Sequence, residues 1–291
     1  MRKKTKKIYV GDVAVGGDSP ISVQSMTTAK TSDVESVVAQ INALEEAGCD
    51  IARSAINSIE DAKAIVEIKK RTNIPLVADI QFDYKLALAA VEYGCDCLRY
   101  NPGNIGGSDK VKLLVDKCKE KNIPIRIGVN SGSISREIVD RFGGVNSDSL
   151  VASALEEVKI LEEMEFTDIK ISVKSSDVNT MIDAYRKLSA KVDYPLHLGV
   201  TEAGPLYQAL VKSSIGIGSL LKDGIGDTIR VSITGDILEE VKAGKAILKA
   251  LNLRRDGLDI VSCPTCSRTT VNLPEIVKEV EEKSKGLDIY A

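Results

Sequence analysis

Apolar residues along the chain alternate between short continuous runs and longer stretches with a helical repeat. The short runs predict eight strands buried on both faces, over residues 21–26, 50–56, 75–80, 97–101, 124–129, 168–173, 195–200 and 228–233. The stretches between them predict amphipathic helices, because apolar residues spaced three or four apart share one face. These helices cover a segment from Val34 to Leu44, residues 59–71, 84–93, 110–121, 149–164, 178–191 and 206–221, and a segment from Ile237 to Leu251.

Eight consecutive strand–helix units predict a (β/α)₈ TIM barrel over residues 1–251. An open, doubly wound α/β sheet is the alternative, although it rarely uses eight parallel units in succession. The basic start of the chain predicts a solvated tail before the first strand. Residues 252–291 predict the start of a second, smaller domain, with a strand over 258–262 and a helix over Leu273–Lys283. So short a segment cannot bury a core of its own without a metal or further chain.

Composition narrows the class of protein. Apolar residues make up 43% of the chain, charged residues 28%, and the net charge is −3, so we expect a soluble globular protein without nucleic-acid or membrane partners. The start has no apolar core of a secretory signal, and no apolar run approaches the ~20 residues that span a bilayer. We therefore expect a cytoplasmic protein, in which Cys49, Cys95, Cys97 and Cys118 act as small buried hydrophobes.

Polar side chains recur where the predicted strands end, which is where TIM barrels place their active sites. They are Arg53, Asp79, Arg99, Asn101, Arg126, Asn130, Lys174, His197, Thr201, Glu202, Arg230 and Ser232. Five of them are cations on five strands, and buried unpaired charges are costly, so we expect them to bind an anion with more than one charged group. The alternative is that each cation pairs with a carboxylate such as Asp79 or Glu202.

His197 is the only histidine of the chain. Hydrogen-bonded to Glu202 or to a ligand oxygen, it could donate a proton or orient a substrate. The alternative is a core histidine with satisfied hydrogen bonds. The loops at residues 101–104 and 130–133 could present backbone N–H groups to a phosphate, or could be ordinary turns.

Cys263 and Cys266 form the only C-x-x-C of the chain. This spacing fits half of a zinc site, a dithiol redox pair, or half of an iron–sulfur site. The surrounding pattern lacks the βαβ unit of a thioredoxin-like pair. Either metal site needs two further ligands, and no Cys or His follows Cys266 in these 291 residues.

A series of longer motifs is more specific. In order, they are GG at residues 16–17, PI at 20–21, VQSMT at 23–27, PLVADI at 75–80, RYNPGNIG at 99–106, RIGVN at 126–130, SVKSSD at 172–177, PLHLGVTEAG at 195–204, GIGDTIRVS at 224–232 and SCPTC at 262–266. Together they resemble the GcpE family of 4-hydroxy-3-methylbut-2-enyl diphosphate synthases over essentially the whole chain.

The resemblance implies reductive opening of 2-C-methyl-D-erythritol 2,4-cyclodiphosphate, with loss of water, in the methylerythritol phosphate route to isoprenoids. Ferredoxin or flavodoxin would supply electrons through a [4Fe-4S] cluster, two of whose ligands would be Cys263 and Cys266. It also implies a homodimer, and it implies that residues 252–291 begin a small α+β iron–sulfur domain that binds this cluster. We expect catalytic roles for His197, Glu202 and Asp79. We expect substrate contacts from Arg53, Arg99, Asn101, Arg126, Asn130, Lys174, Thr201, Arg230 and Ser232.

The chain departs from the family pattern in three places. Gln81 replaces a histidine, so it cannot exchange a proton there, and Ser267 replaces a glycine. The 291 residues also end before a third Cys and a Glu that the resemblance implies as cluster ligands, so we expect them alone to bind substrate without turnover. The alternatives are a pterin-binding barrel transferase resembling dihydropteroate synthase, and a non-catalytic phosphate-binding barrel with a zinc-stabilised tail.

Overall fold

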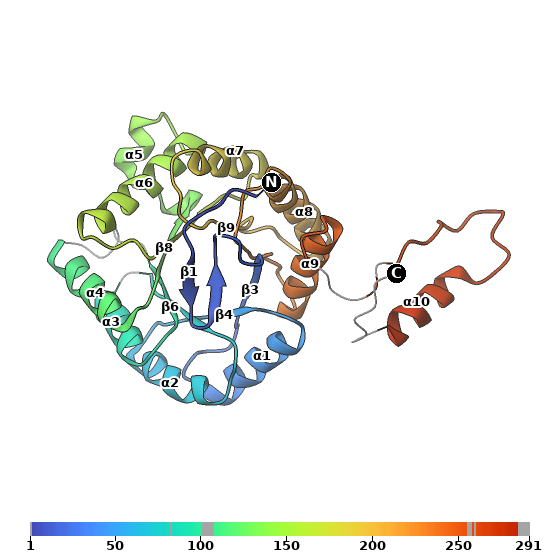
Figure 1. Ribbon diagram of the computed structural model, residues 1–291, viewed down its shortest axis with the longest axis horizontal. Helices are drawn as coiled ribbons and strands as arrows, with labels where there is room; N and C mark the ends of the chain where they lie inside the picture. Colours follow the sequence, from blue (N-terminus) through green and yellow to red (C-terminus); the bar gives the residue numbers. More distant parts are fainter. Residues whose placement is uncertain (1, 82, 101–107, 255–257, 259, 285–291) are drawn as a thin grey trace.

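A computed structural model describes residues 2–81, 83–100, 108–254, 258 and 260–284. Its centre is a sheet of eight parallel strands ringed by helices (Figure 1). The strands are β3 (Ser22–Met26), β4 (Ile51–Ala55), β5 (Leu76–Asp79), β6 (Cys97–Tyr100), β7 (Ile125–Asn130), β8 (Ile169–Lys174), β9 (His197–Leu198) and β10 (Thr228–Ile229). Each lies within, or one residue beyond, a predicted strand.

The sheet curls into a barrel. Its strand order is β8-β7-β6-β5-β4-β3-β10-β9, and a parallel bridge between Ile171 and Leu196 joins the two edge strands. The backbone N–H of Ile171 donates to the carbonyl of Pro195 at 2.9 Å across the same seam. The predicted (β/α)₈ barrel is confirmed, and the open doubly wound sheet is wrong.

Helices cover the outside of the barrel, and each predicted helix is present. They are α1 (Val34–Glu46), α2 (Ile59–Lys70), α3 (Tyr84–Glu92), α4 (Ser108–Lys121), α6 (Ser147–Glu163), α7 (Val178–Ser189), α8 (Leu206–Lys222) and α9 (Ile237–Ala250). A short helix that the sequence pattern did not indicate, α5 (Arg136–Arg141), precedes α6. Among the described helices, none is long and apolar enough to cross a membrane.

The start of the chain is not the solvated tail that was predicted. Two strands, β1 (Ile8–Val10) and β2 (Val13–Val15), pair antiparallel and form a hairpin. Its apolar side packs on Ile51, Val77 and Cys97 at the amino-terminal ends of the barrel strands. Burial of these residues explains why the hairpin folds back, and it lies across the centre of the helix ring, over the amino-terminal ends of the strands (Figure 1).

The C-terminal segment differs in part from the prediction. No strand forms at residues 258 and 260–262, the described part of the predicted strand. The predicted helix is present as α10 (Leu273–Lys283), and none of its residues is buried. A strand needs a neighbour to hydrogen-bond its backbone, whereas a helix satisfies its own, which explains why only the helix appears. The division into a barrel and a cluster domain stays a prediction.

Candidate active site

A cavity of about 590 Å³ opens at the carboxyl ends of the barrel strands. All five predicted cations line it, together with Asp79, Asn130 and Thr201. The remaining lining residues are Met26, Gln81, Gly128, Gly132, Ser133, Ile134, Ser172 and Val200. The expectation that the cations converge on one mouth is therefore met by the geometry.

Strand register explains how the charges gather. Asp79 pairs with Arg99 across β5 and β6, and Arg99 pairs with Arg126 across β6 and β7. Arg126 in turn pairs with Lys170 on β8. Residues in register on neighbouring strands point to the same face of a sheet, so all four side chains point into the barrel.

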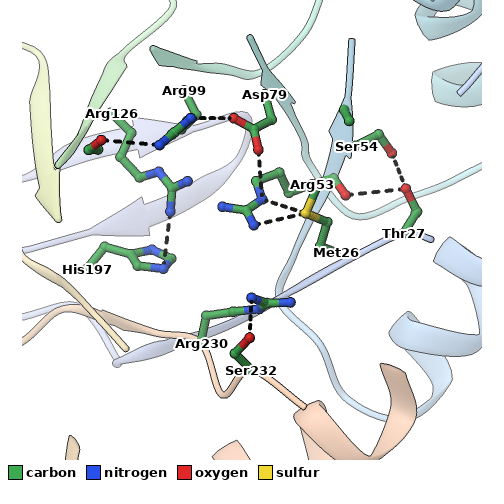
Figure 2. Close-up of polar contacts among 12 residues, drawn as sticks. Met26, Thr27, Arg53, Ser54, Asp79, Arg99, Arg126, His197, Arg230 and Ser232 are labelled. Carbon is green, nitrogen blue, oxygen red and sulfur yellow. Dashed lines mark hydrogen bonds and ion pairs between the residues drawn. The ribbon is translucent and has the colours of Figure 1, made fainter. Parts of the chain in front are cut away.

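Asp79 is the counter-ion of two arginines (Figure 2). Arg99 Nη1 donates to its Oδ1 at 3.1 Å, and Arg53 Nε lies 3.7 Å from its Oδ2. Burial alone would raise the pKa of Asp79, but the charges of Arg53, Arg99 and Arg126 outweigh it and hold the pKa below its ordinary value. Asp79 is therefore ionised at neutral pH, which suits positioning of the arginines better than donation of a proton.

A glycine makes room for Arg99. A Cβ built on Gly128 would lie 2.6 Å from Arg99 Nε, closer than atoms can approach. The Gly128 carbonyl also accepts a hydrogen bond from Arg99 Nη2 at 3.2 Å. The RIGVN motif thus holds a glycine because the guanidinium crosses β7 at that residue.

His197 is fully buried and lies beneath the cavity instead of lining it. Its Nε2 is 3.2 Å from Arg126 Nη1 (Figure 2). An arginine N–H can only donate, so Nε2 accepts and the neutral ring carries its proton on Nδ1. Burial, followed by repulsion from Arg126 and Lys174, lowers the pKa of His197 well below its ordinary value. No hydrogen bond joins it to Glu202, so this part of the sequence hypothesis is wrong.

Arg230 is held from two sides. Glu240, on α9, accepts its Nη2 at 2.8 Å and its Nε at 3.2 Å. Ser232 Oγ accepts its Nη1 at 3.0 Å (Figure 2). Ser232 therefore contacts the predicted substrate-binding arginine and is absent from the cavity lining.

Lys174 is the one cavity cation without a hydrogen bond or ion pair among the described residues. Burial, followed by repulsion from Arg126, Arg53 and Arg230, lowers its pKa well below the ordinary value. A Cβ on Gly199 would lie 2.6 Å from the backbone oxygen of Arg230 and 3.0 Å from Lys174 Nζ, so the backbone beside Lys174 needs a glycine. An ammonium so placed gains most from an anion entering the cavity.

Two other predicted residues lie differently. Glu202 is exposed, has a backbone φ of 52°, and makes no hydrogen bond or ion pair within the described part of the chain. It follows β9 at the mouth and does not line the cavity. Asn101 and the rest of the loop at 101–104 lie outside the described residues.

Sequence reasoning missed three residues that shape this site. The Met26 sulfur accepts hydrogen bonds from Arg53 Nε at 3.2 Å and Nη2 at 2.9 Å. Lys170 is fully buried below the cavity, and its Nζ has no hydrogen-bond partner among the described residues. Glu240 sits on the buried face of its helix beside Val241, three residues after Ile237. A charged residue inside that apolar repeat was the signal available for Glu240.

Cys263 and Cys266 are both exposed free thiols. The backbone N–H of Arg268, its side chain, and Thr269 lower the pKa of Cys266, so its thiolate is favoured. Thiolates are the ligands that iron–sulfur clusters and zinc prefer. The donor type fits a cluster, although no group of three or more ligands occurs among the described residues.

Solved structures share the fold of this chain. A dihydropteroate synthase from Xanthomonas albilineans matches with a TM-score of 0.57 at 14% identity, covering 84% of this chain and 98% of that one. A 3-dehydroquinate dehydratase from Geobacillus kaustophilus matches with a TM-score of 0.57 at 14% identity, covering 87% and 98%. At such identity the likeness concerns the barrel alone.

Relatives found by sequence share far more identity with this chain than these solved structures do. A protein from Clostridium tetani named 4-hydroxy-3-methylbut-2-en-1-yl diphosphate synthase (flavodoxin) is 59% identical over 287 residues, covering 99% of this chain and 82% of its own. A protein of the same name from Nitratiruptor is 59% identical, covering 98% and 81%. The family model for the GcpE TIM-barrel domain matches residues 5–245. With the arginine-lined mouth in the matched region, this chain belongs to the GcpE family of 4-hydroxy-3-methylbut-2-enyl diphosphate synthases.

Proposed function

We propose that this protein catalyses the reductive ring opening of 2-C-methyl-D-erythritol 2,4-cyclodiphosphate to 4-hydroxy-3-methylbut-2-enyl diphosphate. The observation that carries the proposal is the cavity itself, which five cations line, while only two buried carboxylates, Asp79 in the lining and Glu240 behind Arg230, offset their charge. The excess of positive charge suits a diphosphate. The names of relatives sharing more than half of the sequence supply the particular product, and the family resemblance implies the cyclic diphosphate as its substrate.

The cations would bind the two phosphates. Arginine forks match phosphate oxygens in pairs, so we assign this role to Arg53, Arg99, Arg126 and Arg230, with Lys174 as a point charge. Asn130 and Thr201 line the same cavity and offer neutral hydrogen bonds to the rest of the substrate. Asn101 and Ser232 remain proposed contacts.

The roles of the predicted catalytic residues in proton transfer are proposals too. Asp79 and His197 are each engaged by an arginine, which supports positioning roles for both. Glu202 is the carboxylate free to exchange a proton, since no described residue pairs with it. Its φ of 52° is rare for a side chain with a Cβ, and such backbone strain gathers at functional sites.

The electrons for the reduction would come through the C-terminal segment. Cys263 and Cys266 would provide two ligands of a [4Fe-4S] cluster, which supplies the reducing electrons when bound. Flavodoxin or ferredoxin would deliver these electrons, and the relatives' names favour flavodoxin. We further propose a homodimer in the cytoplasm.

Isothermal titration calorimetry with two ligands tests the proposal. We expect the cyclic diphosphate to bind with 1:1 stoichiometry, and dihydropterin diphosphate, the substrate type of the alternative transferase, to bind far more weakly. Raising the salt concentration should weaken the binding, because charged contacts dominate it. Preference for the pterin ligand, or no heat with the cyclic diphosphate, would contradict the proposal.

A further inference from the structure

Glu240 is a buried carboxylate on a helix that packs against the outside of the barrel. Only 2% of its side chain is exposed. Carboxylates are almost never so buried unless they are paired, because the loss of hydration is costly. Its partners therefore indicate what the residue is for.

Both oxygens of Glu240 are fully used. Oε2 accepts from Ser25 Oγ at 2.7 Å and from Arg230 Nε at 3.2 Å. Oε1 accepts from Arg230 Nη2 at 2.8 Å and from the backbone N–H of Ile233 at 3.1 Å. One carboxylate thus ties α9 to strand β3, to Arg230 and to the loop after β10.

We propose that Glu240 is the positioning residue for Arg230, fixing that guanidinium so that its free edge meets a phosphate oxygen of the substrate. The inference rests on the proposed function and extends it. Arg230 has five N–H groups. Glu240 takes two and Ser232 one, which leaves two without a partner among the described residues.

Arg230 needs this support more than its neighbours do. It follows β10, which is only two residues long, whereas Arg126 lies inside the six-residue strand β7. A long side chain on a short strand has many conformations to lose when it binds a ligand. Holding it in place before the substrate arrives removes that loss, as Asp79 does for Arg99.

The negative charge of Glu240 disfavours substrate binding, whereas its positioning of Arg230 favours it. A negative charge beside the cavity repels phosphate, so a neutral substitution would mix weaker positioning with stronger attraction. Glu240→Asp separates the two effects, because it keeps the charge and shortens the side chain by one methylene. The matched control is Glu239→Asp, at the next residue of the same helix, where the carboxylate pairs with the surface residue Lys242.

The experiment is a double-mutant cycle read by calorimetric affinity for the cyclic diphosphate. We expect Glu240→Asp to weaken binding about tenfold, and Glu239→Asp to leave it unchanged. In an Arg230→Ala background, Glu240→Asp should have no further effect. An unchanged affinity in Glu240→Asp would overturn the inference. An equal loss in both backgrounds would also overturn it, because a purely structural role does not depend on Arg230.

Two additions keep the outcome clear. The same cycle is run with inorganic pyrophosphate, so that failure of the wild-type protein to bind the cyclic diphosphate counts against the proposed function and not against the role of Glu240. If Glu240→Asp does not fold, Ser25→Ala removes one of the four hydrogen bonds. A loss of pyrophosphate affinity that depends on Arg230 then supports positioning, and an unchanged affinity refutes it.

Discussion

The buried amine of Lys170 gives the sharpest prediction about stability. Burial lowers its pKa from an ordinary value of 10.5 to about 8, and its Nζ has no hydrogen-bond partner among the described residues. An amine whose pKa falls on folding lowers the free energy of unfolding, and the full loss applies at any pH below its folded-state pKa. The cost disappears as the pH rises through the unfolded-state value. Lys170→Met, which keeps the length and removes the charge, should therefore stabilise the protein, and more so at low pH.

The size of the effect follows from the linkage between protonation and folding. Because the pKa of Lys170 falls by about 2.5 on folding, Lys170→Met should raise the free energy of unfolding by about 3 kcal/mol at pH 7. At pH 10 the gain should be about 1 kcal/mol. Urea unfolding followed by circular dichroism measures both values. Lys159→Met is the control, because that side chain is 76% exposed and should show no such pH dependence. A Lys170→Met variant whose stability gain is the same at both pH values, or absent, would refute the reasoning.

Three further predictions concern the site. Arg126→Ala should weaken calorimetric binding of the cyclic diphosphate about tenfold or more, while the surface variant Arg186→Ala should not. Gly128→Ala should weaken the same binding severalfold by displacing the guanidinium that crosses it, whereas Gly218→Ala, with nothing near its Cβ, should be neutral. His197 is the only histidine, so its imidazole signals in ¹⁵N NMR should stay those of the neutral Nδ1–H form from pH 5.5 to pH 8; a titration in that range would contradict its burial beneath Arg126.

The barrel could be predicted because each of its strands is identified from a short run of consecutive residues. A strand buried on both faces is apolar throughout, and the position of a charge within it, as at Arg99, tells where the mouth lies. The hairpin of β1 and β2 was not predictable, because each strand has three residues and is stable only against the barrel floor.

The candidate site was predictable in its residue types and not in its pairings. The pattern identified the five cations, yet it could not tell that Asp79 would serve two arginines, because that depends on strand register. It also offered Glu202 as one of two possible hydrogen-bond partners of His197, since the two residues are close in sequence. In the structure, strand order instead brings His197 to Arg126 on β7, 71 residues away along the chain.

We expect the arginine-lined mouth of the barrel to be where the cyclic diphosphate binds. A crystal structure of the complex tests this most directly. We expect electron density for both phosphates inside the cavity, with oxygens in hydrogen-bond reach of Arg126, Arg230 and Lys174. Density for the ligand at any other surface, with the cavity holding only water, would contradict it.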